Sequence, residues 1–264
     1  GFAGVQVPWG DVDQQESSGN SVYHGLTVAV SKRFSRHFEF LSSYTWSHAI
    51  DDSTDLQTLL TPQDNRRPGL ERGNSTFDQR HRWVTSAVFE SPFKRTDEGW
   101  HRKFLADFIV APIIEVASGR PFSVLTGTDL SLDFGSNTDR PSVASSGGVS
   151  SPFIPGVNFV PPTVCDVAVP GVTTPFGFGC TGNLGRNAFV RPNFFQWDLR
   201  VSRKFYFGEK LNLEFITDMF NLFNRFNVGD VSPLCNPVAG TCSAGEPTAA
   251  LDPRQFQFGL KLNF

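Results

Sequence analysis

The amino-acid sequence predicts an all-β fold, an antiparallel transmembrane β-barrel segment of about seven long strands. Three observations predict it. Residues 254–264 alternate strictly between apolar and polar side chains, which gives a strand one apolar and one polar face. Short turns alternate along the chain with long polar loops, as do the periplasmic turns and extracellular loops of outer-membrane barrels. No stretch approaches the roughly 18 consecutive apolar residues of a transmembrane helix.

The first predicted strands form a hairpin. Residues 21–34 and 38–48 both alternate, and the polar residues 35–37 between them make a tight turn. Residues 81–93 form the next strand, with weaker alternation, and the charged residues 94–99 follow as a short turn. The sheet therefore continues beyond the hairpin through a second short connection.

The remaining strands are predicted from the same signals. Residues 100–118 read as one long strand in which Pro112 marks a bulge or an edge position. Alternation returns at Phe195, and residues 208–210 turn the chain into a partner strand over 211–223. The terminal alternating segment completes the series.

Three long segments rich in Gly, Pro and polar residues, 51–80, 119–192 and 227–252, are predicted to be extracellular loops. If the carboxyl terminus is periplasmic, all three lie outside. Residues 1–264 are thus expected to be the carboxyl-terminal part of one outer-membrane barrel domain. Complete bacterial barrels have even strand numbers, so we expect further strands upstream. Gly1–Pro8 lacks the basic start and apolar run of a signal peptide, which predicts a mature form or a fragment.

Composition and short motifs exclude several classes of function. The net charge of −3 and pI near 6.0 provide no basic surface for nucleic acid. The Gly-x-Ser-x-Gly nucleophile motif and the phosphate-binding Gly-Lys-Ser/Thr loop are absent, and no Ser/His/Asp set stands out. We therefore expect neither enzymatic activity nor a cofactor.

Four cysteines lie in loop segments as two local pairs: Cys165, Cys180, Cys235 and Cys242. This arrangement favours two disulfides and an oxidising compartment over four thiols.

A cluster of charged side chains ends the first long loop. One interpretation is a ligand-contacting or gating cluster at the barrel mouth. The favoured one is a network of ion pairs that holds the loop in place, because loop charges are commonly structural. The cluster consists of Glu71, Arg72, Asp78, Arg80, His81 and Arg82. His48, Asp51 and Asp52 are residue types that bind metals, but they lack a recognisable zinc or calcium spacing, so no metal site is predicted.

The polar faces of the predicted strands carry charged side chains that should point into the lumen and pair across strands, since charge on the lipid face is costly. We expect them to solvate the lumen or contact a plug rather than bind substrate. They are Glu39, Asp198, Arg200, Lys204, Glu214 and Asp218. Four tryptophans are candidates for the aromatic girdles at the membrane interfaces, or for ordinary strand packing: Trp46, Trp83, Trp100 and Trp197. Trp100, beside a short turn, is the best candidate for the periplasmic rim.

An ordered set of short motifs runs through nearly the whole chain. It comprises Tyr23-His-Gly-Leu, Tyr44-Thr-Trp-Ser-His-Ala, the segment from Glu71 to Arg82, Ser118-Gly-Arg-Pro-Phe, Gly185-Arg-Asn and Phe220-Asn-Leu-Phe-Asn. This set resembles the end of Oar-like TonB-dependent outer-membrane receptors. The resemblance implies a plugged barrel of about 22 strands. The TonB box, the plug and the signal sequence of that family do not occur in these residues.

The resemblance also implies function and partners. It implies the barrel portion of a receptor in a Gram-negative outer membrane, transporting an unknown ligand. Its partners would be outer-membrane lipid, the TonB complex through the missing amino-terminal part, and the barrel-assembly machinery. That machinery would read the terminal apolar residues Phe256, Phe258, Leu260, Leu262 and Phe264. Two alternatives stay open: a structural or adhesive barrel without energy-coupled transport, and a soluble secreted all-β binding domain.

Overall fold

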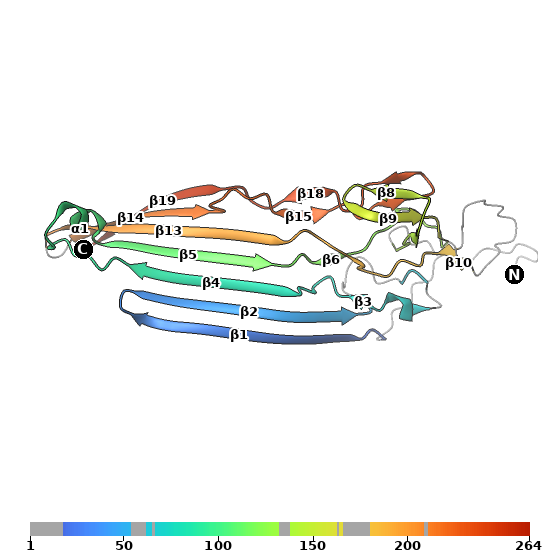
Figure 1. Cartoon of the computed structure of the whole chain (residues 1–264), viewed down its shortest axis with the longest axis horizontal. Helices are drawn as coiled ribbons and strands as arrows, with labels where there is room; N and C mark the ends of the chain where they lie inside the picture. Colours follow the sequence, from blue (N-terminus) through green and yellow to red (C-terminus); the bar gives the residue numbers. More distant parts are fainter. Residues whose placement is uncertain are drawn as a thin grey trace, which may run out of the picture.

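The computed structural model describes residues 18–53, 62–64, 67–131, 138–162, 164–165, 180–208 and 211–264. One antiparallel sheet dominates this part of the chain, in the strand order β1-β2-β4-β5-β13-β14-β19, with a short strand β3 paired to β2 (Figure 1). The strands are β1 (Ser21–Ser35), β2 (Phe38–Asp51), β3 (Gly73–Asn74), β4 (His81–Glu90), β5 (Phe108–Ala117), β13 (Phe194–Phe207), β14 (Leu211–Phe220) and β19 (Gln255–Asn263). The prediction of about seven long antiparallel strands is confirmed.

The strand register places most of the large apolar side chains on one face of this sheet. Trp83 of β4 lies opposite Tyr44 of β2 and Val116 of β5, and Val116 lies opposite Phe195 of β13. Phe258 of β19 is 66% exposed although it belongs to that apolar face. Large exposed apolar side chains along a whole sheet face indicate contact with lipid rather than water.

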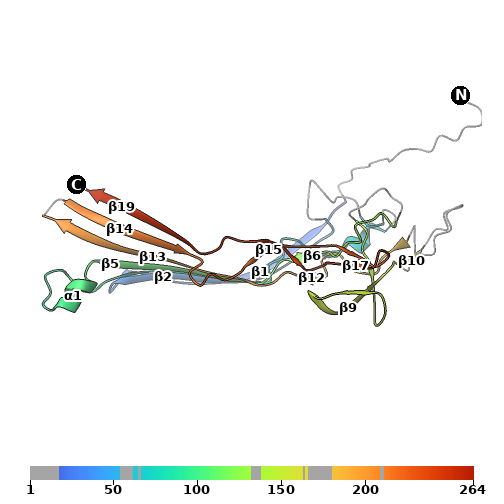
Figure 2. The same ribbon diagram turned by 90° about the horizontal axis from the view of Figure 1, so that it is seen from above.

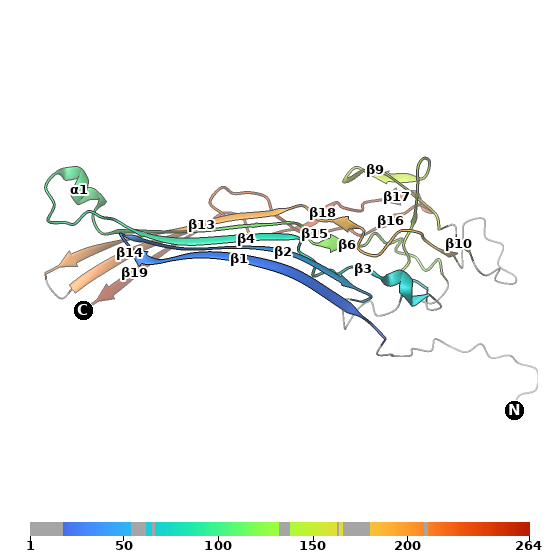
Figure 3. The same ribbon diagram turned by 60° about the horizontal axis from the view of Figure 1, so that its bottom comes forward.

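The sheet is arched. In Figures 2 and 3, β14 and β19 bend to one side of the central strands, and α1 (Trp100–Leu105) lies on the other, convex side. Within the described residues β1 and β19 form the two edges of the sheet and do not pair with each other. No helix among these residues is long and apolar enough to cross a membrane.

The short connections gather at the end of the sheet that also holds the carboxyl terminus (Figure 1). Arg36 and His37 both adopt positive φ, 52° and 70°, which a two-residue hairpin turn of the primed type requires. Glu209 and Lys210 of the predicted turn 208–210 lie outside the described residues.

The prediction of one strand over 100–118 was wrong in its first part. Residues 100–105 form α1, and β5 begins only at Phe108. Trp100, Phe104 and Leu105 recur at helical spacing around the polar run 101–103, so the period there is helical rather than alternating. Pro112 lies within β5 and pairs with Leu199 of β13. On the other side of β5, the pairing with β4 omits Pro112 but keeps the same register before and after it. Proline lacks the N–H that would complete that ladder, so it interrupts pairing instead of making a bulge.

The long segments contain small sheets of their own at the opposite end. Their strands are β6 (Pro121–Phe122), β7 (Ser142–Ala144), β8 (Val149–Ser151), β9 (Ile154–Val160), β10 (Val164–Cys165), β11 (Cys180–Thr181), β12 (Phe189–Val190), β15 (Val228–Val231), β16 (Cys235–Asn236), β17 (Thr241–Cys242) and β18 (Pro247–Ala250). A short 3-10 helix spans Pro68–Glu71. The prediction of loops here was incomplete, because all of these strands but β9 span only two to four residues and leave almost no periodic signal in a sequence.

Candidate functional site at the long-loop end

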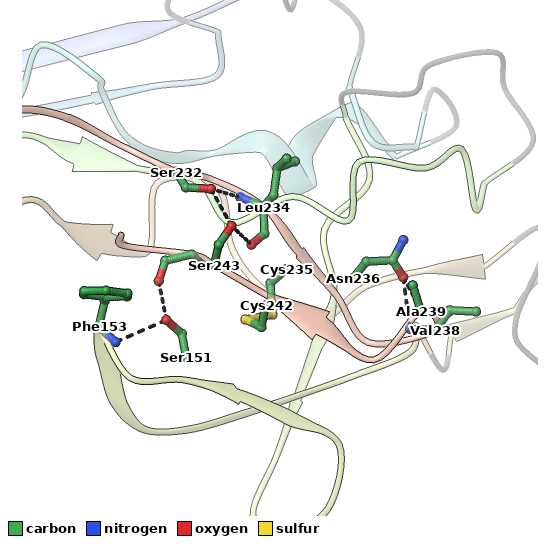
Figure 4. The surroundings of a disulfide bond; sticks show 11 residues. Ser151, Phe153, Ser232, Leu234, Cys235, Asn236, Val238, Ala239, Cys242 and Ser243 are labelled. Carbon is green, nitrogen blue, oxygen red and sulfur yellow. Dashed lines mark hydrogen bonds between the residues drawn. A yellow bond between two sulfur atoms is a disulfide. The ribbon is translucent and has the colours of Figure 1, made fainter. Parts of the chain in front are cut away.

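Two of the long segments share a hydrophobic core at this end, and we call the folded body they form the cap. Its buried side chains come from 119–192 and from 227–252, and they are Phe122, Val124, Ile154, Phe159, Leu184, Val231, Cys235 and Ala244. Leu125 and Leu234 form a parallel bridge between the two segments. Ser151 donates to the carbonyl of Ala244 at 2.5 Å, beside the disulfide between Cys235 and Cys242 (Figure 4). The two segments are therefore one packed unit.

A buried ion pair joins the first long segment to the cap. Arg140 donates from both terminal nitrogens to the carboxylate of Glu71, at 2.7 and 2.9 Å, and the two side chains are 4% and 8% exposed. Arg140 also donates from Nε to the carbonyl of Leu184 at 2.8 Å. Gln63 donates its backbone N–H to Glu71 and its amide to the carbonyl of Gly182, both at 3.0 Å. With these hydrogen bonds the pair meets the conditions under which two charges are tolerated in a protein interior.

Arg186 connects the same region to the end of β2. Its Nε donates to the carbonyl of Glu71 at 2.7 Å, and Nη2 donates to the carbonyl of Asp51 at 2.6 Å. Arg186 also pairs with the Asp51 carboxylate. The carbonyl of Arg186 lies where a side chain on Gly73 would be, since a Cβ there would approach it to 2.6 Å. Glycine at 73 thus permits the close approach of the two backbones.

Two asparagines continue this junction. Asn187 donates its side-chain amide to the carbonyl of Asn74 at 2.7 Å and its backbone N–H to Ser123 Oγ at 2.9 Å. The Ser123 hydroxyl returns a hydrogen bond to the Asn187 side chain at 3.0 Å. Asn187 has φ of 52°, a conformation that asparagine tolerates better than most residues. Segments that are distant in sequence thus converge at one rim of the sheet.

The other members of the predicted charge cluster make separate contacts. Arg72 pairs with Asp52 at 2.9 Å and donates to the carbonyl of Asn20 at 3.1 Å. The hydrogen bond from Arg72 is the main cause that lowers the pKa of Asp52 below its ordinary value of 3.8. The Arg82 guanidinium pairs with Glu115 at 2.9 Å across β4 and β5.

His48 and its neighbours form a second small group. Arg80 Nη2 lies 2.7 Å from His48 Nδ1, and the Asp78 carboxylate lies 3.4 Å from the same nitrogen. Asp78 accepts the backbone N–H of Ala49 at 2.7 Å. His81 Nδ1 and the Tyr44 hydroxyl share a hydrogen bond of 2.8 Å. The six charged residues are therefore not one site, but a series of contacts along the rim.

The three side chains considered as metal ligands each contact an arginine: His48 contacts Arg80, Asp51 contacts Arg186 and Asp52 contacts Arg72. Among the described residues there is no group of three or more His, Cys, Asp or Glu side chains placed to hold a metal ion. What the arrangement does chemically is hold the loops rigidly on the strand ends.

The polar face of the sheet carries the charges predicted for the lumen. Arg200 of β13 is the register partner of Asp218 of β14, and its guanidinium donates to that carboxylate at 2.6 and 2.9 Å. Glu214 accepts from Ser202 at 2.8 Å and lies opposite Lys204 in the ladder. Two further residues complete the set: Asp198, bound by Gln196 and the backbone of Asn221, and Glu39, which lies opposite Val88. All lie on the face opposite the lipid-facing side chains.

One predicted disulfide, Cys235–Cys242, is present and links β16 to β17. Cys180 is also disulfide-bonded, and Cys165 is its register partner in the β10–β11 ladder. The side chain of Cys165 lies outside the described part of the chain. Both ladders lie at the long-loop end.

Sequence reasoning missed the residues that organise the junction, Arg140, Arg186 and Gln63. Arg186 lies next to a glycine within the motif Gly185-Arg-Asn, and its place in that motif was the one sequence feature that could have identified it as a junction residue. Arg140 and Gln63 carry no local signal, because their partners lie 69 and 119 residues away.

A comparison with protein families decides the identity. The profile of the family described as "Outer membrane beta barrel domain" matches residues 3–257, nearly the whole chain. The chain belongs to this family. A comparison with curated proteins finds no match. As an outer membrane beta barrel domain, the chain resides in the outer membrane, and its apolar sheet face is the surface that lipid covers.

Proposed function

We propose that this outer membrane beta barrel domain is the carboxyl-terminal barrel portion of an Oar-like, TonB-dependent receptor of a Gram-negative bacterium, and that it takes part in transport of a ligand across the outer membrane. The observation that carries the proposal is the cap. A core, a disulfide and the buried pair Glu71–Arg140 fix the long segments in one arrangement at the exposed end. A preorganised surface of this kind captures a ligand with little loss of conformational entropy.

The motif resemblance supports the same proposal. Two of the motif segments meet at the junction described above, one through Asn74 and the other through Asn187. Ser123, which directly follows a third motif, contacts Asn187 there. The polar sheet face, with Arg200 and Asp218 paired across strands, suits the wall of a lumen that holds water or a plug. No enzymatic role is proposed.

One observation favours the second candidate, a structural or adhesive barrel. The cap exposes apolar side chains, among them Val143, Phe153 and Leu234, which could contact another surface. Family membership and the exposed apolar sheet face speak against the soluble secreted alternative.

The test compares the medium of three strains: one with the full-length protein, one with its gene deleted, and one with the gene intact but lacking the TonB complex. Transport predicts a compound that only the first strain removes from the medium. An adhesive barrel predicts equal depletion in all three strains together with reduced surface attachment of the deletion strain alone.

A further inference from the structure

The lipid-covered face of the sheet carries two cations toward the short-turn end, Lys32 of β1 and Arg203 of β13. Lys32 satisfies its ammonium group internally. Its Nζ donates to the carbonyls of Ser35 and Phe38, at 2.7 and 2.9 Å, and lies 3.5 Å from the centroid of the Phe38 ring. Nothing further is required to hold this cation at the edge of the hydrocarbon.

Arg203 is held differently. Its guanidinium lies between three phenylalanine rings, with centroid distances of 5.6 Å to Phe104, 4.9 Å to Phe108 and 5.1 Å to Phe205. Within the described residues it makes one hydrogen bond, from Nη2 to the carbonyl of Lys103 at 3.1 Å, and no ion pair. An arginine has five N–H donors, so most of its hydrogen-bonding capacity is uncommitted. The side chain is half-buried, and its remaining donors are open to the surroundings.

The segment that precedes β5, residues 94–107, adds more positive charge near Arg203. Arg102 and Lys103 of α1 are exposed, and Arg95 donates to the carbonyl of Tyr206 of β13 at 2.9 Å, which brings it to the same strand. None of these cations forms an ion pair with a carboxylate in the described part of the chain. The acidic side chains of the segment are Asp97, which accepts the backbone N–H of Lys94, and Glu98 and Asp107.

The position of α1 places these cations at the membrane interface. The helix lies on the convex side of the arched sheet (Figures 2 and 3), which is the lipid side. Trp100 is 81% exposed and Phe104 59% exposed, and both belong to the helix. Exposed aromatic rings beside basic side chains are typical of a helix that lies in the headgroup region.

We propose that α1 and Arg203 bind the phosphodiester of an anionic phospholipid in the leaflet at the short-turn end of the barrel. The uncommitted N–H donors of Arg203 match phosphate oxygens in geometry and charge, and Arg102 and Lys103 add attraction. The acyl chains of the lipid pack against Phe104 and Phe108. The phosphate offsets the cost of a guanidinium on a largely apolar face. This site depends on membrane insertion alone and stands or falls independently of transport.

The test uses native mass spectrometry of the full-length protein in a phosphate-free detergent solution, titrated with phosphatidylglycerol or with a diacylglycerol of the same chains. We expect a resolved phosphatidylglycerol adduct and no diacylglycerol adduct at equal concentration. Arg203→Gln should weaken phosphatidylglycerol binding about tenfold, because a charge-assisted contact is lost, and Arg203→Lys should weaken it less.

Arg225→Gln is the matched control, since Arg225 also lies over a phenylalanine ring, Phe195 at 5.6 Å, but at the opposite end of the sheet. It should leave the adduct unchanged, and circular dichroism verifies that each variant is folded. Equal binding by the unsubstituted protein and Arg203→Gln overturns the proposal, as does an equal loss in Arg225→Gln. Complete displacement of the lipid by millimolar inorganic phosphate also overturns it, because the site would then bind a free anion.

Discussion

Arg140 and Glu71, 69 residues apart in sequence, form a bidentate ion pair that joins the first long segment to the cap. Neither charge reaches solvent appreciably. The pair therefore has a large effect when one partner is removed and a small effect when both are replaced together.

Glu71→Gln should loosen the cap, since it leaves the Arg140 guanidinium buried without a counter-charge, at a cost of about 3–5 kcal/mol. Faster hydrogen exchange at the amide of Leu184 would report it. The double variant Glu71→Gln/Arg140→Met should recover most of the protection. Glu115→Gln is the control, because its pair with Arg82 is more exposed and is expected to contribute about 0–1 kcal/mol. Equal exchange in all variants would contradict the assigned role.

The ion pair between Arg72 and Asp52 predicts a pH dependence. Arg72 lowers the pKa of Asp52 below 3.8, so the stabilisation is complete above that pH and is lost as the pH falls through the lower value of the folded state. Arg72→Gln should raise the pKa of Asp52 toward 3.8. Carboxyl ¹³C shifts of the protein in micelles measure the midpoint. Arg67→Gln, which removes one ion-pair partner of Asp64, should leave that midpoint unchanged.

Two neighbouring residues of β19 are expected to differ in how strongly a lysine substitution destabilises the inserted protein. Phe258 belongs to the lipid face and Gln257 to the polar face. Phe258→Lys should destabilise the inserted protein by up to about 2–4 kcal/mol, while Gln257→Lys should have little effect. Urea titration of the full-length protein folded into vesicles gives both values. A larger loss for Gln257→Lys would reverse the assignment of the two faces.

The disulfide between Cys235 and Cys242 should stabilise the cap without affecting the main sheet. The double variant Cys235→Ala/Cys242→Ala removes a cross-link with a sequence separation of 7, for which loop entropy predicts a loss of about 2–3 kcal/mol. Hydrogen exchange should accelerate in β16 and β17 and stay unchanged in β14. Acceleration throughout β14 would show that the cap and the sheet unfold together.

The long strands were predictable because their signal is local. The alternation of apolar and polar residues predicts which face of the sheet each side chain occupies, both in the terminal segment and in the strand from Phe195. The register of β13, β14 and β19 agrees with that prediction. The helix at Trp100–Leu105 was missed because a strand interpretation was extended over a six-residue segment with helical spacing. In a short segment, two or three apolar residues fit either period.

The junction at the long-loop end could not be predicted in the same way. Arg140 and Arg186 stand in polar, breaker-rich sequence, and their importance arises only when folding brings Glu71 and Asp51 to them. The favoured interpretation of the charge cluster, ion pairs that hold the loop, named Glu71 without its partner. Contacts between distant residues leave no periodic pattern to read.

The shared core of the cap has a consequence for how this surface can change. Phe159 from one segment and Val231 from the other are both buried in it. Deleting or transplanting either segment alone would uncover apolar side chains of the one left behind. Variation in the surface of the cap is therefore expected to occur through substitutions at exposed positions such as Val143 and Phe153, or through exchange of both segments at once.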